Sequence, residues 1–455
     1  MSGAVILLCL AMATARAEAD SLVSQLGASR YADRETAAAS LERLGRAAIP
    51  ALKAARNHRD TEIRARSEAL LVKIEGSLLL QPTMLTLDFH NQPVSEVVKQ
   101  INAKSGVELL SLTDVRGPSA SRLVTLEEPR AVPFWTAIDR LCDASGLQYT
   151  LGGQSNPMLR ETSIRLSTGD ARLAGLLSDH GPFRFNLLSL HYQRDLTFGV
   201  NPGQAIQAMQ IGGAPPVATT TRFGAEQFSL RLQLAVEPQL SLSTIGTAKV
   251  VAATDDLGQS LVLPPAGGPM QVNNGIFRTN AGPTQFHVFL KRPEKPGRTI
   301  RSIKGVLPLS VSTRKTEALS IPLEGAVGKT FRNEDATLTI HDRKLPPGLN
   351  QTSVDLSIVA KVSRSMANEE IDAMMMMPRV DVSPLNLELL DDKGSPIPWF
   401  LSVSSQNGDE LRLTLTIRRV DPSQSTNPKP VTLRYFGTIQ STAEIPFAFA
   451  DVPMP

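Results

Sequence analysis

Hydrophobic and polar residues follow the same order twice between residues 85 and 151. In the first copy, apolar and polar side chains alternate over residues 85–89, which is the period of a strand. Apolar residues then recur at helical spacing over 94–101, and a second strand pattern follows. Residues 123–151 repeat this order, which predicts a doubled βαβ module. The side chains that we expect its two helices to bury are Val97, Val98, Ile101, Ala137, Ile138 and Leu141.

Proline and glycine mark the same two positions in each copy. Pro93 and Pro133 stand where we expect the first helical residue, because a first turn leaves that N–H unpaired in any case. Gly106 and Gly146 follow the helices, where a left-handed residue commonly ends a helix. Both copies therefore carry their own start and stop signals.

The doubled segment, residues 81–151, resembles the short βαβ domains at the N-terminal side of secretins and TonB-dependent receptors, called secretin/TonB short N-terminal (STN) domains. The resemblance is carried by LTLDFHNQPVSEVVKQINAKSGVELL and VTLEEPRAVPFWTAIDRLCDASGLQYTL. It implies a periplasmic domain that docks on partner proteins and performs no chemistry. It does not extend to the secretin or receptor barrel, so neither secretion nor siderophore uptake is implied.

Residues 18–80 have a helical pattern, with Asp60 as an expected N-cap ahead of Glu62. The segment resembles the helical pairs of HEAT repeats, through the cues DRE at 33–35, LG at 44–45, AIPAL at 48–52 and EIRAR at 62–66. Solenoid repeats usually need about three units to be stable, and this segment has room for two at most. We therefore expect it to cover one face against the βαβ module or a partner.

The rest of the chain has many short strand patterns separated by glycine, proline, asparagine and aspartate, which is typical of β-sandwiches. We expect one sandwich over 157–366, a linker over 367–379 and a second, smaller sandwich over 380–455. The expected strands are 183–196, 226–240, 244–255, 284–292, 305–313, 318–324, 335–341, 351–362, 380–391, 398–404, 410–420, 430–440 and 443–449.

Two short motifs recur in this half, which favours two related units. The sequence DDLG at 255–258 returns as DDKG at 391–394, and ALSIPL at 318–323 has an echo in AEIPF at 443–447. The expected fold class is thus multidomain α+β: a short α-helical repeat, a doubled βαβ module and two β-sandwich units.

The N-terminus has the pattern of a secretory signal peptide over residues 1–17. A short apolar run precedes Ala15-Arg16-Ala17, an A-x-A cleavage site, so we expect a mature chain that begins at Glu18. No later apolar run reaches the ~18 residues that a membrane span needs. These features predict a periplasmic or secreted protein that is peripheral to a membrane at most.

Charge and cysteine content narrow the choice of partners. The formal net charge is +3 over 455 residues, which predicts no nucleic-acid partner. Cys9 would leave with the signal peptide, so Cys142 would have no second cysteine in the same chain for a disulfide. We expect Cys142 to be a small buried residue rather than a nucleophile.

No local motif indicates a catalytic, cofactor-binding or metal-binding residue. The stretch GAVGKT at 325–330 lacks the first glycine of a phosphate-binding loop and predicts a turn. Each DDxG motif predicts a hairpin turn rather than a calcium site, and the basic stretch 291–304 predicts a solvated loop rather than a polyanion site. His180 and His191 flank an expected strand and are the place where a distant aspartate would complete a catalytic site.

These observations together predict an exported, non-enzymatic protein-interaction or scaffold protein of the bacterial cell envelope. Its partner would be an envelope or extracellular protein. Two alternatives stay open: an envelope hydrolase whose site is assembled from distant residues, and a carbohydrate-binding structural protein. A pocket with converging histidine, aspartate or serine side chains would favour the hydrolase. Exposed aromatic side chains on one sandwich face would favour carbohydrate binding.

Overall fold

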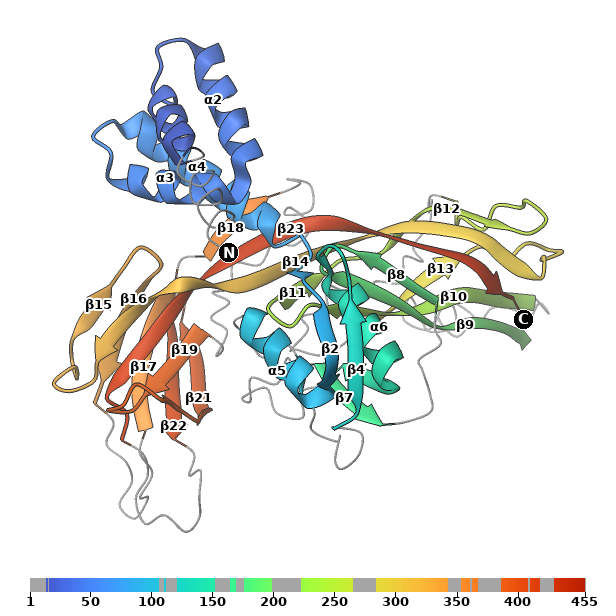
Figure 1. The fold of residues 1–455 in the computed structure, drawn as a ribbon. Helices are drawn as coiled ribbons and strands as arrows, with labels where there is room; N and C mark the ends of the chain where they lie inside the picture. Colours follow the sequence, from blue (N-terminus) through green and yellow to red (C-terminus); the bar gives the residue numbers. More distant parts are fainter. Residues whose placement is uncertain are drawn as a thin grey trace, which may run out of the picture.

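The computed structural model confirms a multidomain α+β fold that is rich in β-sheet (Figure 1). Helices lie in the N-terminal third of the chain, and strands dominate from residue 164 onward. No helix in the described part of the chain is long and apolar enough to cross a membrane. The structure describes residues 14, 16–105, 110–111, 121–151, 164–168, 176–198, 222–264, 284–342, 353–360, 362–366, 386–407, 410–417 and 429–454.

The N-terminal module is a small bundle of helices with an aliphatic core (Figure 1). Asp60 is the N-cap of the last helix and accepts a hydrogen bond from the backbone N–H of Glu62 at 2.8 Å, as predicted. The core includes Ala19, Leu26, Leu41, Leu52, Leu71 and Ile74. The helices are 16–25, α2 (Tyr31–Leu44), α3 (Ile49–Ala54) and α4 (Thr61–Leu78), with 3₁₀ turns η1 (Gly45–Ala48) and η2 (Ala55–Asn57) around α3.

The doubled strand–helix–strand order is confirmed. The first copy consists of β2 (Asp88–Pro93), α5 (Val94–Ser105) and β3 (Leu110–Ser111), and the second of β4 (Leu123–Glu127), α6 (Phe134–Ser145) and β6 (Leu147–Leu151). Two short strands, β1 (Met84–Leu85) and β5 (Val132–Pro133), pair with each other. All six helical side chains expected to be buried are at most 4% exposed and share one core.

Three details of this unit differ from or fall outside the prediction. Pro133 is the extended N-cap of α6 and not its first helical residue, and Pro93 likewise ends β2. Gly146 has a left-handed φ of 67° as expected, whereas Gly106 lies outside the described residues. The unit also extends past Leu151, because β7 (Ile164–Thr168) pairs with both β3 and β6.

Two β-sandwiches make up the rest of the described chain. In the first, the four-stranded sheet β13-β10-β9-β8 packs against β11, β12 and parts of two long strands, β14 and β23. In the second, the five-stranded sheet β15-β16-β17-β22-β21 packs against β19, β20 and the other parts of those strands. The strands of the first sandwich are β8 (Leu176–His180), β9 (Phe183–Phe198), β10 (Arg222–Val236), β11 (Ser241–Ile245), β12 (Lys249–Asp255) and β13 (Thr284–Leu290).

The long strands β14 (Thr299–Pro322) and β23 (Thr432–Pro453) pair antiparallel along their whole lengths and cross both sandwiches (Figure 1). This pairing overturns the expected division at residues 366 and 380, because each sandwich takes strands from both sides of it. It also joins strands that we expected to be separate, 305–313 with 318–324 and 430–440 with 443–449. The second sandwich contains β15 (Thr330–Arg332), β16 (Ala336–His341), β17 (Ser353–Ala360), β19 (Leu387–Leu390), β20 (Pro396–Ile397), β21 (Trp399–Asn407) and β22 (Glu410–Ile417).

The repeated DDxG motifs form matching turns, one in each sandwich. Asp255 accepts hydrogen bonds from the backbone N–H groups of Leu257 and Gln259, and Asp391 accepts them from Lys393 and Ser395. Gly258 and Gly394 both have a φ of 77°. The other repeated motif does not follow the same division. Residues 318–322 belong to the sandwich that contains the Asp391 turn, and residues 443–447 belong to the sandwich that contains the Asp255 turn. The two halves of the sequence therefore exchange strands.

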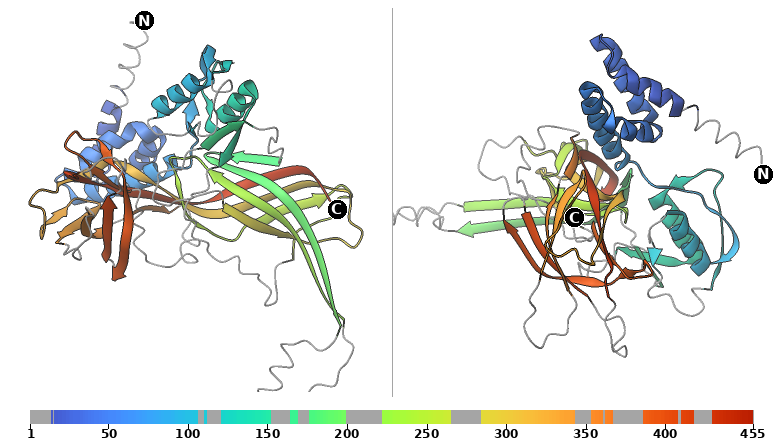
Figure 2. Two further views of the ribbon diagram at one scale, coloured as in Figure 1. Left: turned by 90° about the horizontal axis from the view of Figure 1, so that it is seen from below. Right: turned by 90° about the vertical axis from the view of Figure 1, so that its left-hand side faces the viewer.

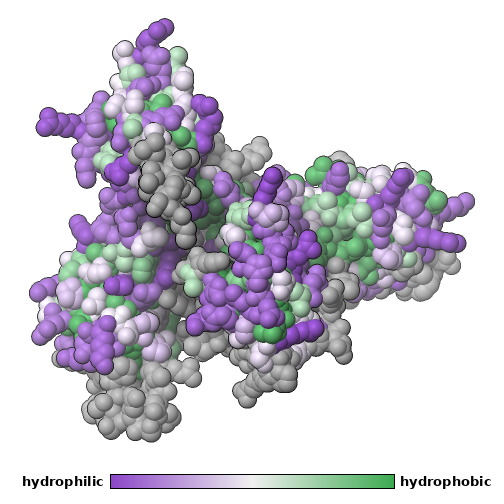
Figure 3. Space-filling view, in the orientation of Figure 1, coloured by the Kyte–Doolittle hydropathy of each residue, from purple (hydrophilic) through white to green (hydrophobic). Residues whose placement is uncertain are grey.

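The surface view shows hydrophilic residues over most of the helical module and hydrophobic residues gathered on the first sandwich, at the right of Figure 3. The outer parts of β9 and β10 leave that sandwich as a two-stranded ribbon (Figure 2). Residues 222–227 pair with 193–198 in this ribbon, beyond the residues that pair with β8 and β13.

Candidate functional site

The ladder between β14 and β23 is interrupted near its middle by a bulge. Arg314 pairs with Thr438 and Ala318 pairs with Phe436, so residues 315–317 stand opposite Gly437 alone in the register. Extra residues in one strand bend it and increase its twist. The bulge lies where the long strands pass from one sandwich to the other, and we refer to this region as the waist.

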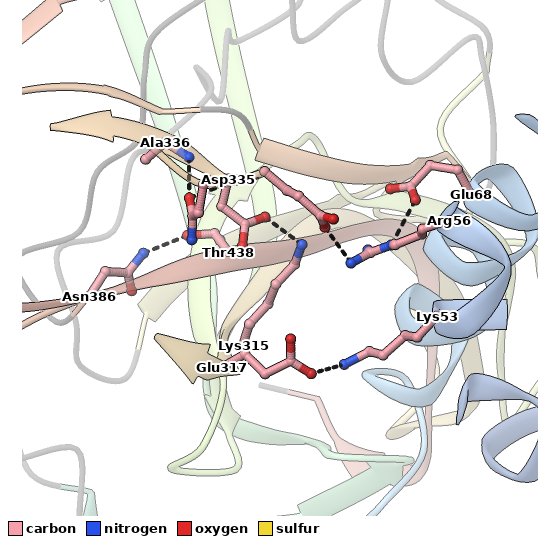
Figure 4. Close-up of polar contacts among 11 residues, drawn as sticks. Lys53, Arg56, Glu68, Lys315, Glu317, Asp335, Ala336, Asn386 and Thr438 are labelled. Carbon is pink, nitrogen blue, oxygen red and sulfur yellow. Dashed lines mark hydrogen bonds and ion pairs between the residues drawn. The ribbon is translucent and has the colours of Figure 1, made fainter. Parts of the chain in front are cut away.

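The bulge brings Lys315 against Asp335 at the waist (Figure 4). Lys315 Nζ lies 2.5 Å from Asp335 Oδ1, and both side chains are 13% exposed. The side chain of Asn333 accepts hydrogen bonds from the backbone N–H groups of Asp335 and Ala336 at 3.0 and 2.8 Å, which orients this turn. A Cβ atom at Gly437 would lie 2.4 Å from the Asp335 carboxyl, so glycine leaves the room that this ion pair occupies.

The helical module is fastened to the waist by ion pairs (Figure 4). Lys53 Nζ lies 2.7 Å from Glu317 Oε1 in the bulge. Arg56 pairs with Glu334 and, at 3.0 Å, with Glu68 of α4. These acids raise the pKa of Arg56 although burial lowers it. These contacts place the module against the sandwiches, whereas from the sequence we expected the βαβ unit or a partner in that position.

Glu75 of α4 lies partly buried near this cluster of charges. Burial raises the pKa of its carboxyl, and the positive charges of Lys315, Lys53 and Arg56 oppose that effect. α4 also contacts β23 and β18 (Val362–Met366), which runs parallel to β23. The last helix of the module is thus seated on the edge of the long ladder.

A second junction joins the βαβ unit to the first sandwich through Arg184. This side chain is 2% exposed and forms bidentate ion pairs with Asp139 of α6 and Asp179 of β8, with N–O distances of 2.6 to 2.7 Å. Its guanidinium carbon lies 4.9 Å from the ring centre of Trp135, and Nη1 donates to the Tyr149 hydroxyl at 2.9 Å. Burial lowers the pKa of Arg184, but the hydrogen bonds to both aspartates outweigh it and raise the pKa above its usual value.

A third junction holds the segment between α4 and β1. The buried carboxylate of Glu237 accepts the backbone N–H of Thr83 at 3.1 Å, and Gln239 donates to both Glu237 and the Thr83 hydroxyl. Burial raises the pKa of Glu237, while these hydrogen bonds lower it. Each of the three junctions lies either on the β14–β23 pair or on the sheet β13-β10-β9-β8 that packs against it. The junctions therefore fix the modules relative to one another.

These junctions are made of ion pairs and hydrogen bonds between groups of the protein itself. They orient modules, and they do not place a nucleophile beside a base. Among the described residues, no group of three or more His, Cys, Asp or Glu side chains is arranged to hold a metal ion. We therefore regard the junctions as positioning elements and the outward faces of the modules as the candidate functional surfaces.

The two histidines singled out from the sequence are separate in the structure. His180 is exposed at the end of β8, whereas His191 lies on the outer face of β9 with Nε2 2.8 Å from Ser189 Oγ. No aspartate orients either ring among the described residues. Cys142 is partly buried against the core of the βαβ unit.

The remaining motifs occupy turns and loops. Gly325 and Gly328 have φ values of 62° and 76° in the turn between β14 and β15, which confirms that prediction. Residues 291–298 form a loop fastened by Asp255 and Asp256, which accept the backbone N–H groups of Gly297 and Arg298. The rest of the basic stretch, 299–304, belongs to β14, so the loop prediction was wrong for those residues. The expected linker over 367–379, which contains four methionines at 374–377, lies outside the described residues.

Few features of the sequence pointed to the residues that form the junctions. Arg184 interrupts an apolar strand, and Trp135 and Asp139 are one helical turn apart, but nothing local links the two segments. Glu237 likewise ends a strand pattern and meets a partner far away in the sequence. An isolated charge within an apolar strand was the one usable signal, since such a residue needs a buried partner.

The comparisons with known proteins give no relative. No protein-family model matches the chain, and no curated protein or solved structure matches it with significance.

Proposed function

We propose that the chain is an exported, non-enzymatic protein-interaction or scaffold protein of the bacterial cell envelope. The observation that supports this most is the fixed arrangement of modules around β14 and β23. The helical module, the βαβ unit and both sandwiches are each tied to this ladder, directly or through a packed sheet. Such a body presents several surfaces in a constant relation, which suits the simultaneous binding of partners.

The proposed location rests on the N-terminal sequence and on the resemblance to STN domains. Residues 1–17 have the apolar run and A-x-A site of a signal peptide, and the resemblance implies a periplasmic domain. The absence of a membrane-spanning helix among the described residues is compatible with either a periplasmic or a secreted protein. A partner in the envelope or outside the cell follows from this location.

Capture of partners from envelope extract, paired with an assay of envelope-polymer hydrolysis, tests the proposal. We expect the full chain and the His180→Ala/His191→Ala variant to capture the same envelope protein, because no carboxylate among the described residues orients either ring as it would a catalytic base. Neither protein should degrade peptidoglycan or envelope polysaccharide. Turnover that disappears in the double variant would contradict the non-enzymatic function.

A contact of His191, one of the two histidines singled out from the sequence, favours the hydrolase alternative. The distance of 2.8 Å between Ser189 Oγ and His191 Nε2 is within the range for a nucleophile and its base. The two residues are neighbours on the open face of one strand, however, and no orienting carboxylate is present among the described residues. The Ser189→Ala variant separates the alternatives, since it would abolish hydrolysis by such a pair and leave protein capture intact.

A further inference from the structure

We propose that the outer face of the sheet β13-β10-β9-β8 binds a neutral polysaccharide chain. This binding would be additional to the scaffold function and does not depend on it. The inference rests on the kinds of side chain that face outward and on their positions in the ladder.

The outward side chains are identified by strand alternation. Phe185, Phe228 and Phe286 point into the sandwich core, so the residues between such core positions point outward. The register places side chains of three neighbouring strands in rows across the outer face. We name this surface the amide face after its glutamines; its principal members are His191, Gln193, Gln227, Gln233, Gln285 and His287.

The chemistry of the amide face is unusual for a solvated sheet. Arg231 carries the one formal charge among the described outward side chains of residues 186–193, 227–233 and 285–289. Exposed sheet positions are more commonly filled by lysine, glutamate and other charged residues. The opposite face of the same sandwich follows that habit, with an ion pair of Lys249 and Glu444 at 3.3 Å and exposed Arg301 and Lys304.

The rows form a grid of hydrogen-bonding groups, which a bulge at Leu188 interrupts. Neighbouring strands are about 4.8 Å apart, and outward residues on one strand are about 6.8 Å apart. Arg231 Nε donates to Gln285 Oε1 at 3.0 Å, and Ser189 and His191 are hydrogen-bonded along β9. Amides, hydroxyls and imidazoles both donate and accept, as the hydroxyl groups of a sugar do, so the grid matches a polyhydroxyl chain.

Two neighbouring rings lie at one edge of the grid. The rings of His287 and Phe289 are stacked, with centroids 6.3 Å apart and planes at 24°. Phe289 is partly exposed and His287 is exposed. Flat rings offer contact area to the apolar face of a sugar ring, which lies parallel to them. Trp135 and Trp399 do not contribute, since both pack into cores.

Other polymers fit the amide face less well. Nucleic acid binding requires several cationic side chains to neutralise phosphates, and the face has Arg231. An acidic polysaccharide has the same requirement. Stable protein interfaces have an apolar and aromatic centre, whereas this face is centred on glutamine and serine. The neutral polysaccharide is therefore the ligand class that the side chains favour.

Affinity electrophoresis of the full chain tests the proposal. Native gels would contain amylopectin, dextran, glucomannan or hydroxyethylcellulose, with alginate as the anionic comparison. We expect at least one neutral polysaccharide to retard the protein. The Gln285→Ala/His287→Ala variant should bind it about tenfold more weakly, because the loss of two hydrogen-bonding side chains removes about that much affinity.

The matched control is Arg301→Ala/Lys304→Ala on the opposite face, which should be retarded like the unmodified chain. Gln193→Ala/Gln227→Ala, at exposed positions farther along the face, provides a second variant if the first lowers the melting temperature. The proposal is overturned if no neutral polysaccharide retards the protein, if alginate alone does, or if variants that keep the native melting temperature bind like the control.

Discussion

Replacement of Arg184 with methionine is expected to lower the free energy of unfolding by about 3 kcal/mol, because it removes one partner of a buried ion-pair network. Methionine keeps much of the packing against Trp135. It leaves Asp139 and Asp179 facing each other without the cation that now joins them. Both aspartates are more than a third exposed and regain some water, so the expected loss is at the lower end for a buried pair. Urea unfolding measures it.

The same substitution should loosen the βαβ unit from the first sandwich. Trp135 Nε1 donates to the Pro182 carbonyl oxygen at 3.1 Å and its ring is 1% exposed, so release of the unit should shift tryptophan fluorescence to longer wavelength. Arg194→Met on the same strand is the control. Its ion pair with Glu226 is exposed, and its loss should cost less than about 1 kcal/mol.

The network itself is tested by neutralising the two aspartates. If unpaired carboxylates cause the loss, Asp139→Asn/Asp179→Asn should recover part of the stability in the methionine background. An Arg184→Met protein as stable as the Arg194→Met control would show that Arg184 does not hold the junction. An equal loss with and without the asparagines would assign the effect to packing.

Replacement of Gly437 with alanine is expected to lower the free energy of unfolding by about 2 kcal/mol, within the range for overpacked sites. The new Cβ would lie 2.4 Å from Asp335 Cγ and Oδ2, so the carboxylate must move. Lys315 would then lose its ion-pair partner while it stays largely buried. Thermal and urea unfolding of the full chain would both report the change.

A double-mutant cycle separates this clash from a general effect on the strand. Asp335→Ala removes the atoms that the new Cβ would contact. The free energy of unfolding lost in the double variant should therefore be smaller than the sum of the losses in the two single variants. Coupling of about 1 kcal/mol is expected for groups in direct contact. Strict additivity would mean that Gly437 is needed for its backbone and not for the space beside Asp335.

The parts of the fold that the sequence predicted are those set by local periodicity. The apolar residues around Val98 and around Ile138 recur at helical spacing, so each helix has one apolar face. The apolar faces of both helices are buried. The DDxG turns were likewise predictable, since an aspartate that accepts hydrogen bonds from its own turn and a glycine with positive φ act over a few residues.

The continuity of β14 and of β23 was not predicted, for a physical reason. Lys315, Thr316 and Glu317 break the alternation of β14 just as a turn would, and Ser441 with Thr442 does the same in β23. A sequence pattern shows where the alternation of apolar and polar residues is interrupted. It does not show whether the strand ends there or continues its pairing after a bulge. The pairing of residues 299–322 with 432–453 joins segments that are far apart in the sequence, and so does the ion pair of Arg184 with Asp139. Local periodicity predicts neither contact.

Cleavage of the chain between β18 and β19 is the most direct test of the central claim that one shared ladder joins all the modules. A specific protease site placed within residues 367–379, which lie outside the described residues, would allow the folded protein to be cut. The two fragments should co-elute as one species in size-exclusion chromatography and separate only in denaturant, because β14 and β23 stay paired. Elution as two separate folded fragments would contradict the account and restore the division into independent sandwiches.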